Sequence, residues 1–593
     1  MSADRSEPVS PRIPEPDPDE TLIMPAPGTE ALEHGSLSSD PEDETVQPAA
    51  AVPKAAKSST AASAMVAAGI LLSRVMGLVR ESVFAAYFGT TAFADVFRAA
   101  LKMPNFLQNM LGEGTLSASF IPVYSELLHE GREREAGKLA GAIFGLLAAG
   151  AGALALIGVL GAPLITTVFL PGFEGERYEL AVHITRILFP MAGILVLSAW
   201  SLGILNSHRQ FFLPYFAPVF WNAAMIATLL LMGSRLSLDR LVVALSWGAL
   251  IGGALQFLVQ LPGVLKVEKG LRFSFGRGVP GVRDAVTNAG PAITGRGVVQ
   301  ISAWADTWLA SLLSVGALAI FGYASTLYLL PISLFGMSVA AAELPELARQ
   351  RQGNTEALRL RTSAGLERIA FYIVPSFVAY AVLGDVVIAT IYQRGEFTRA
   401  DTLSTWVVLL GFTTGLIATT GSRLFSSTFF ALRDTRTPAR FAVIRVVLSI
   451  VLGIVLMLTF EGVKVDKWGM NIPAGPLGHL RVGGQPLGVF GLTLGAGIAA
   501  WIEWWMLKRA LRARIGAVGA GAGPLSRMFA AAIAGAAAGW GVRLLLPDGV
   551  SSLISGVLIL GVYGLVYFGV AAALGLEQSG AIFRRIKGML GRR

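Results

Sequence analysis

The sequence predicts an all-α polytopic membrane protein, and three observations support that prediction. Of its 593 residues, 53% are hydrophobic and only 15% are charged, whereas about a quarter of the residues in a soluble domain are charged. Apolar segments of about 20 to 30 residues recur from Ala61 onward, each long enough to cross a hydrocarbon layer of about 30 Å. None has the alternating pattern of a membrane β-barrel, so helices are expected.

We expect fourteen transmembrane helices. Their approximate spans are 61–88, 94–124, 139–169, 179–206, 213–233, 241–264, 285–314, 317–347, 364–392, 403–431, 440–461, 485–507, 526–546 and 551–575. An even number of crossings places both ends of the chain on the same side of the membrane.

The distribution of Lys and Arg predicts which side that is. Basic residues are concentrated in alternate connections, most densely in residues 266–283 and in the C-terminal segment 577–593. Because basic loops are retained on the cytoplasmic side, both termini are expected to be cytoplasmic.

The first sixty residues differ in composition from the rest. They hold 12 Asp and Glu against 4 Lys and Arg, and are rich in Pro and Ser. Such a segment buries too little apolar surface to offset its ordering entropy, so residues 1–60 are expected to form a disordered acidic cytoplasmic tail. A signal peptide would instead begin with basic residues followed by an apolar run.

An internal repeat suggests how the helices are grouped. A shift of 227 positions aligns Gly89 with Gly316 and Pro104 with Pro331 at equivalent places in successive spans. Chance similarity between apolar helices is the alternative, although it does not explain why Gly and Pro coincide. A six-helix repeat gives two parallel lobes related by an axis along the membrane normal. The expected units are an N-lobe over 61–265, a C-lobe over 284–508 and two further helices over 525–576.

Charged residues inside the first two spans predict a functional site. An ionisable group at the bilayer centre costs about 2.5 to 3.5 kcal/mol on insertion scales, so each requires an explanation. Arg74 and Arg80 lie about 120° apart around a helix and flank one polar side. Asp95, Arg98 and Lys102, spaced three and four residues apart, share one face of the next helix.

Basic residues outnumber acidic ones in these two spans, which points to an anionic cargo. Guanidinium groups keep their charge and bind phosphate oxygens in pairs. The alternative is that these side chains extend to the headgroups or pair internally with Glu81, Asp95 or Asp306. Arg296 and Asp306 add charge within the span 285–314.

Other chemistry has little support in the sequence. The chain has no Cys and five dispersed His, so neither a thiolate metal site nor a histidine ligand set is expected. No G-x-x-x-x-G-K-[ST] loop is present, which argues against a built-in ATP motor. We expect a transporter rather than an enzyme, with no metal and no cofactor.

Two series of motifs resemble a known family. The first comprises Ser73-Arg74-Val75-x-Gly77-x-x-Arg80-Glu81, Phe88-Gly89, Ala94-Asp95, Lys102-x-Pro104-Asn105 and Glu113-Gly114-x-x-Ser117-x-Ser119-Phe120-x-Pro122. The second comprises Tyr323-Ala324 before Pro331, Leu344-Pro345, Gln393-Arg394-Gly395-x-Phe397-Thr398 and Asp434-Thr435-x-Thr437-Pro438. Over residues 61 to 510, the chain resembles the MurJ (MviN) lipid II flippases of the multidrug/oligosaccharidyl-lipid/polysaccharide exporter superfamily.

The resemblance implies a fold and a function. The fold would be two six-helix lobes, with the helices of 525–576 forming a groove for a polyprenyl tail. The protein would move the undecaprenyl-diphosphate-linked peptidoglycan precursor, lipid II, from the inner to the outer leaflet of the bacterial cytoplasmic (inner) membrane by alternating access. It would serve peptidoglycan synthesis, cell wall biogenesis and cell shape, work as a monomer without nucleic acid, and draw on membrane potential or on coupling to Na⁺ or H⁺.

The resemblance also assigns roles to residues. Arg74 and Arg80 would contact the diphosphate and the sugar-peptide head. Asp95 would be a gate or pairing residue, with Glu81 a second pairing candidate, and Asp306 a candidate cation site. The substrate-binding set is Arg74, Arg80, Arg98, Lys102 and Arg296.

The chain departs from the family pattern at two positions. Gln108 and Thr326 stand where the family usually has Arg. Arg98 and Arg296, on neighbouring helices, are our candidates for supplying the missing charge.

Three other functions remain open from the sequence. A flippase for another polyprenyl-linked glycan has the same requirements. A cation-coupled drug antiporter of the same superfamily would need acidic residues facing its cleft, and a membrane glycosyltransferase would need paired carboxylates or a metal beside a large outer loop.

Overall fold

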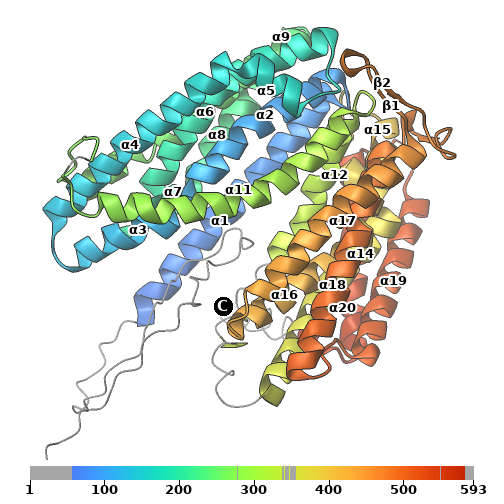
Figure 1. Ribbon diagram of the computed structural model, residues 1–593. Coiled ribbons are helices and arrows are strands. Elements are labelled where there is room, and N and C mark those ends of the chain that lie inside the picture. Colours follow the sequence, from blue (N-terminus) through green and yellow to red (C-terminus); the bar gives the residue numbers. More distant parts are fainter. Residues whose placement is uncertain are drawn as a thin grey trace, which may run out of the picture.

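The computed structural model describes an all-α protein (Figure 1). It describes residues 56–276, 278–336, 339, 340, 343, 346, 347, 355–547 and 549–580, without the side chains of 56–67, 292 and 294–303. The predicted acidic tail up to residue 55 and most of the predicted basic tail, 581–593, lie outside the described residues. The first helix begins at Ala56, five residues before the first predicted span.

The elements follow one another in this order. The first half comprises α1 (Ala56–Phe88), α2 (Ala92–Leu111), α3 (Glu113–His129), α4 (Glu133–Leu160), α5 (Ala162–Phe169), α6 (Gly175–Ser207), α7 (Phe212–Phe216), α8 (Pro218–Met232), α9 (Leu238–Leu258), α10 (Leu261–Val267) and α11 (Val282–Ser311). The second half comprises α12 (Ala317–Pro331), the π-helix η1 (Ile332–Gly336), α14 (Thr355–Tyr392), α15 (Arg399–Thr414), α16 (Leu416–Ala431), α17 (Arg436–Phe460), β1 (Val463–Val465), the 3-10 helix η2 (Asp466–Trp468), β2 (Met470–Ile472), β3 (Arg481–Val482), β4 (Gln485–Pro486), α18 (Gly488–Ile515), α19 (Ala522–Leu545) and α20 (Ser552–Ala573).

The chain is a multi-pass membrane protein. Among the described residues, 11 helical segments are long and apolar enough to cross a membrane. The other predicted spans also contain helix, in α1, in α2 with α3, and in α11. The exact number of fourteen crossings stays a prediction.

Several predicted spans are interrupted. The prediction of one helix over 94–124 was wrong, because the chain breaks at Gly112, between α2 and α3. The span 139–169 likewise breaks at Gly161, between α4 and α5. A side chain at Gly112 would lie 2.4 Å from the carbonyl oxygen of Gln108, so this turn requires glycine. Hydropathy alone does not locate such breaks.

The helices form two groups, which we call the first bundle (α1 to α10) and the second bundle (α12 to α18). Helices within each bundle pack mainly against one another, around α6 in the first and α14 in the second. The bundles approach each other at the end where α2, α12 and α15 lie, and are spread apart towards the opposite end (Figure 1).

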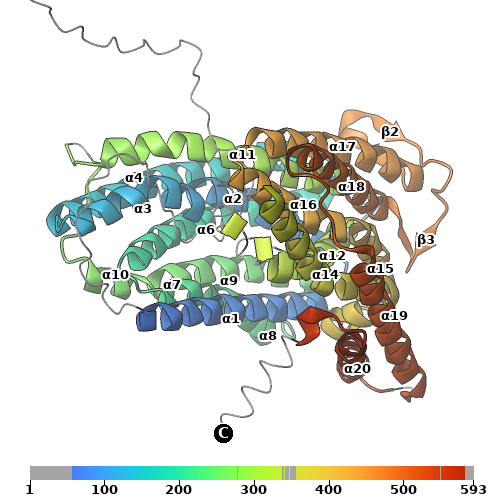
Figure 2. The same cartoon turned by 90° about the horizontal axis from the view of Figure 1, so that it is seen from below.

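Helix α11 connects the bundles but packs mainly along the first. Its contacts with α3 and α2 exceed those with α12, the helix that follows it. Seen from below, α11 runs beside α3 and α4 towards α17 (Figure 2). The unit predicted for residues 284–508 therefore begins with a helix that lies against the other bundle.

Helices α19 and α20 form a pair that packs on α14. The interface is apolar and includes Phe371, Leu383, Ile559 and Tyr567. The opposite faces of both helices expose apolar side chains, as expected of helices surrounded by lipid.

A segment of short strands, residues 462–486, links α17 to α18 and reaches the first bundle. Strands β1 and β2 pair antiparallel around η2. The backbone N–H of Lys467 donates to Glu174 at 3.1 Å, and its ammonium donates to the carbonyl of Phe173 at 3.3 Å. This segment therefore bridges the bundles.

Candidate functional site

A cavity of about 120 Å³ lies between the bundles. Helices α1 and α2 supply most of its wall, α8 one residue and α12 the opposite side. Its lining residues are Arg80, Glu81, Phe84, Phe97, Arg98, Leu101, Lys102, Asn105, Met225, Leu318 and Gly322. This inter-bundle cavity thus brings together four residues of the predicted site: Arg80, Glu81, Arg98 and Lys102.

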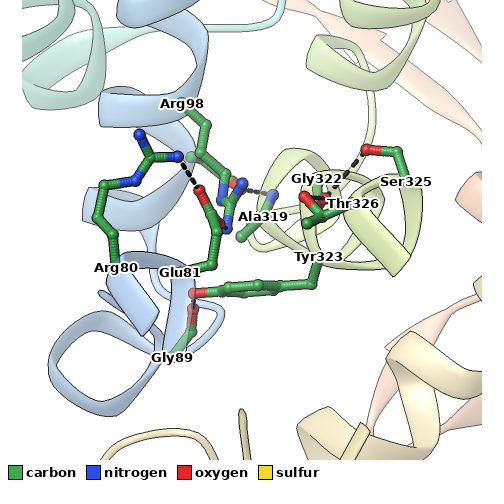
Figure 3. Close-up of polar contacts among 10 residues, drawn as sticks. Arg80, Glu81, Gly89, Arg98, Ala319, Gly322, Tyr323, Ser325 and Thr326 are labelled. Atoms are coloured by element: carbon green, nitrogen blue, oxygen red, sulfur yellow. Dashed lines mark hydrogen bonds and ion pairs between the residues drawn. The ribbon is translucent and has the colours of Figure 1, made fainter. Parts of the chain in front are cut away.

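Glu81 holds two arginines at once (Figure 3). One carboxylate oxygen accepts from Arg80 at 2.7 Å, and the other accepts from Arg98 at 2.5 Å. The predicted internal pairing therefore exists, but one carboxylate serves two guanidinium groups. With Lys102, the cavity wall presents three basic groups and one acidic group.

Arg98 extends from α2 across to α12 of the second bundle. Its guanidinium lies 4.1 Å from the ring centre of Tyr323 and 5.0 Å from that of Phe84. A methyl group on Gly322 would come within 2.5 Å of an Arg98 nitrogen. The missing side chain at Gly322 therefore makes room for the arginine.

Lys102 contacts α11. Its ammonium donates to the hydroxyl of Thr307 at 2.7 Å, next to the half-buried Asp306. The charged groups that act on Asp306 are Lys102 and Arg445, and Arg445 also pairs with Glu503 at 3.0 Å. Within the described part of the chain, no three His, Asp or Glu side chains are grouped as a metal site would require.

Asp95 does not line the cavity, and its side chain is fully buried. Its carboxylate accepts from the backbone N–H of Gly316 at 2.7 Å and of Ala319 at 2.8 Å, at the start of α12. Arg177 of α6 pairs with it at 2.8 Å. A carboxylate at a helix N-terminus satisfies free N–H groups and suits the helix dipole.

Further hydrogen bonds join the bundles beside Asp95, and we call this region the closed end. Tyr323 donates to the carbonyl of Gly89 at 2.9 Å. The N–H of Glu396 donates to the carbonyl of Ala86 at 2.8 Å, and Thr90 donates to Asp401.

Glycine permits the close approach at this end. Gly395 has φ of 56°, and a side chain there would lie 2.1 Å from the oxygen of Ala86. The Arg-Gly-x-Phe motif noted in the sequence is thus the turn that contacts α1.

Two predicted substrate-binding residues are not placed in the cavity. Arg74 is exposed, and donates to Ser333 of η1 at 2.6 Å, so it bridges the bundles away from the cavity lining. Arg296 lies in α11, but its side chain is outside the described residues.

Neither of the two residues that depart from the family pattern, Thr326 and Gln108, lines the cavity. Thr326 donates to the carbonyl of Gly322 in its own helix at 2.9 Å. Gln108 precedes the break at Gly112 and does not line the cavity. Arg98 lies against Gly322 and Tyr323, within one turn of Thr326.

Sequence reasoning missed some partners of these residues. Arg177, the ion-pair partner of Asp95, lies in a different helix and carried no distinguishing pattern. Trp221, whose ring lies 4.8 Å from the Arg80 guanidinium, was also missed. Neither contact has a signal in a single sequence.

Comparison with known proteins identifies the family. The model of the family described as "Lipid II flippase MurJ" matches residues 84–465. The chain belongs to this family. MurJ proteins are transporters rather than enzymes, and the match covers α2, α12 and the Arg-Gly-x-Phe turn. Arg74, Arg80 and Glu81 lie just before the matched range.

Relatives and solved structures agree with the MurJ assignment. A probable lipid II flippase MurJ of Vibrio cholerae is 32% identical over 398 residues, which are 65% of this chain and 75% of the relative. A solved lipid II flippase MurJ in an inward closed conformation superposes with a TM-score of 0.68 and 23% identity, covering 86% of this chain and 98% of the other.

A similar fold occurs in a transporter of another family. An inward-facing multidrug resistance MATE family transporter of the MOP superfamily superposes with a TM-score of 0.58 and 17% identity, covering 77% of this chain and 98% of the other. The predicted membership of the MurJ family is confirmed, and the fold is shared with a MATE family transporter.

Proposed function

We propose that this chain moves lipid II from the inner to the outer leaflet of the bacterial cytoplasmic membrane by alternating access. The observation that carries the proposal is the surplus of basic groups in the inter-bundle cavity, where Arg80, Arg98 and Lys102 face the single carboxylate of Glu81. Diphosphate is the part of lipid II that matches such a surplus, because guanidinium forks bind phosphate oxygens in pairs. The polyprenyl tail stays in lipid, so only the charged head needs a polar route.

Glu81 holds the binding groups in place when no substrate is present. It spans Arg80 and Arg98 and so prevents two nearby cations from repelling each other. An arriving diphosphate offers more acceptor oxygens and more charge than one carboxylate, and therefore replaces Glu81 on both arginines. When the head group leaves, Glu81 pairs with both arginines again.

The closed end is the gate through which the head is released. Asp95 joins α2 to the N-terminus of α12, and Tyr323 joins α12 to the end of α1. Separating the bundles at this end breaks these bonds and exposes the cavity on that side. Asp95 is accordingly a gate residue, and not a ligand of the substrate.

The remaining predicted residues receive roles outside the cavity wall. Arg74, which is exposed and joins α1 to η1, contacts the head group as it enters from the end where the bundles are spread apart. Arg98 supplies the charge that Thr326 does not. Arg296 remains in the proposed binding set on the strength of its sequence position.

We propose membrane potential as the energy source. It is worth about 2.3 kcal/mol per charge per 100 mV. Lys102 and Arg445 already act on the carboxylate of Asp306, so a sodium ion there would have to compete with them.

We further propose that the protein acts as a monomer with both termini in the cytoplasm. The basic connections support this orientation. The lobes over 61–265 and 284–508 would be the moving units, and residues 525–576 would accommodate the polyprenyl tail.

The direct test is depletion of the chain in its host, followed by an assay of which leaflet holds the lipid-linked precursor. Wild-type protein should restore the precursor to the outer leaflet, whereas Arg80→Ala and Arg98→Ala should not. Arg132→Ala is the matched control, since Arg132, on the turn before α4, pairs with Glu130 of that turn and with Glu135 in the first turn of α4. Normal transport by Arg98→Ala at normal protein levels would refute the role of the cavity.

A flippase for another polyprenyl-linked glycan is the nearest alternative, because the diphosphate is common to both cargoes. Competition between purified lipid-linked glycans for the chain distinguishes the two. A drug antiporter for cationic compounds is disfavoured by the basic surplus of the cavity.

A further inference from the structure

A second basic cluster lies outside the inter-bundle cavity, where α14, α15 and α19 meet. Asp385 of α14 is 4% exposed and accepts from two arginines. Arg399, at the start of α15, pairs with it at 2.8 Å, and Arg543, near the end of α19, at 3.1 Å. We call these three residues the Asp385 cluster.

The cluster holds more positive charge than its own carboxylate requires. Asp385 contributes one negative charge and pairs with two arginines, so the cluster carries a net positive charge. The side chains of Arg399 and Arg543 remain 47% and 33% exposed. Each guanidinium has five N–H donors in a planar fork, so donors remain after Asp385 is satisfied.

The surroundings of the cluster are those of a membrane boundary. Arg543 lies 5.0 Å from the ring centre of Trp540, and tryptophan is enriched where lipid meets water. Leu544 and Leu545, which follow Arg543, are among the most exposed apolar side chains of the chain's described part, and Val382 is exposed one turn from Asp385. An anion bound here would have hydrocarbon as its neighbour.

The cluster belongs to the closed end but not to the substrate cavity. Arg399 is two residues from Asp401, which accepts from Thr90 of the first bundle. None of the three cluster residues lines the inter-bundle cavity. A ligand held here would also tie α19 to α14 and α15, beside the contacts that close the bundles.

We propose that the Asp385 cluster binds the phosphate of an anionic membrane lipid at the closed end. The charge surplus selects a phosphate group, and the exposed apolar residues beside it favour one that is attached to acyl chains over a soluble ion. This site is separate from the proposed diphosphate site and does not depend on it.

Native mass spectrometry of the full-length purified chain tests the proposal. The protein is titrated with phosphatidylglycerol, with phosphatidylcholine, or with inorganic phosphate, and bound copies are counted. Arg399→Gln leaves the Asp385–Arg543 pair intact, so the variant should fold, and should bind phosphatidylglycerol about tenfold more weakly, as loss of one charge-assisted hydrogen bond predicts. Arg527→Gln, at the other end of α19, is the matched control and should bind as wild type.

Asp385→Asn gives a result that a purely structural cluster would not. It keeps both arginines and removes the competing carboxylate, so phosphatidylglycerol should bind several-fold more tightly. Equal binding in wild type, Arg399→Gln and Asp385→Asn would overturn the proposal, as would equal retention of phosphatidylcholine. Binding of inorganic phosphate as strong as that of the lipid would overturn the lipid assignment. Because lipid binding is measured without transport, failure here leaves the proposed flippase function untouched.

Discussion

Arg98 reaches the face of Tyr323 because Gly322 has no side chain. A β-carbon at Gly322 would overlap the end of the arginine side chain, not the backbone. The position therefore controls where a guanidinium lies without itself carrying charge.

Gly322→Ala should displace Arg98 while leaving the fold intact. Alanine favours the helix by about 1 kcal/mol over glycine, so the thermal midpoint should not fall. We expect the transport rate of the purified chain in liposomes to drop about tenfold, as for loss of one charge-assisted contact. Gly561→Ala in α20, where the new methyl group meets open space, is the control. Wild-type transport by Gly322→Ala would contradict the proposed role of the Arg98 position.

Glu81→Gln should have opposite effects on binding and on transport. Removing the carboxylate leaves Arg80 and Arg98 without their shared partner, so a polyprenyl diphosphate should bind about tenfold more tightly, or about 1.4 kcal/mol. Release should slow, because nothing recovers the arginines. The free protein should lose about 3 kcal/mol of stability from the broken buried pair. Weaker binding of diphosphate by Glu81→Gln would show that Glu81 does not compete with the substrate.

At this scale, helical spacing predicted which side chains share a face, but it did not predict their partners on other helices. Spacing along helices placed Arg98 and Lys102 on one face, and the structure brings both to the cavity. It did not pair Asp95 with Arg177, because a contact between α2 and α6 depends on how the helices pack. Arg74, grouped with Arg80 from the same helix, instead faces Ser333.

The 462–486 segment is an element that connects the two bundles near the closed end. Its Lys467 is held by the turn between α5 and α6, through Glu174 and the carbonyl of Phe173. The family match ends at residue 465, so most of this segment lies beyond it.

Lys467→Ala should weaken the closed state slightly. Loss of one hydrogen bond of about 1 kcal/mol changes an opening equilibrium by about fivefold. A cysteine at Thr90, in a chain with no native Cys, should then react several-fold faster with a water-soluble maleimide. Lys464→Ala is the control, because Lys464 pairs with the exposed Asp466 of the same segment. Equal labelling rates for Lys467→Ala and Lys464→Ala would show that the segment does not hold the closed end.

The elements themselves were largely predictable, because apolar length determines where a chain can span lipid. Helix lies in every predicted span, but the breaks at Gly112 and Gly161 were missed. The strands of the 462–486 segment were not predicted either, since runs of two or three residues carry no periodicity. The packing of α11 against α3 was beyond sequence reasoning because it depends on tertiary contacts.

For the whole molecule, the proposed function requires the two bundles to separate at the closed end. Thr90 and Asp401 touch across that end through their side chains. A Thr90→Cys and Asp401→Cys pair should therefore be linked by a short thiol-specific crosslinker, and linked protein should lose transport. Reduction of the link should restore it.

A second cysteine pair provides the control for this experiment. The hydroxyl oxygens of Ser125 and Ser207 lie 3.1 Å apart within the first bundle. Linking cysteines at these two positions should leave transport unchanged. Transport by protein linked between Thr90 and Asp401 would rule out opening at this end.

The bonds across the closed end have a consequence for how related chains can diverge. Five of their acceptors and donors are main-chain atoms, at Ala86, Gly89, Gly316, Ala319 and Glu396. A peptide group is present whatever residue occupies the position, so most side chains there are free to vary over evolutionary time. The constrained positions are then the glycines that allow contact and the residues whose side chains reach across, Thr90, Asp95, Tyr323 and Asp401.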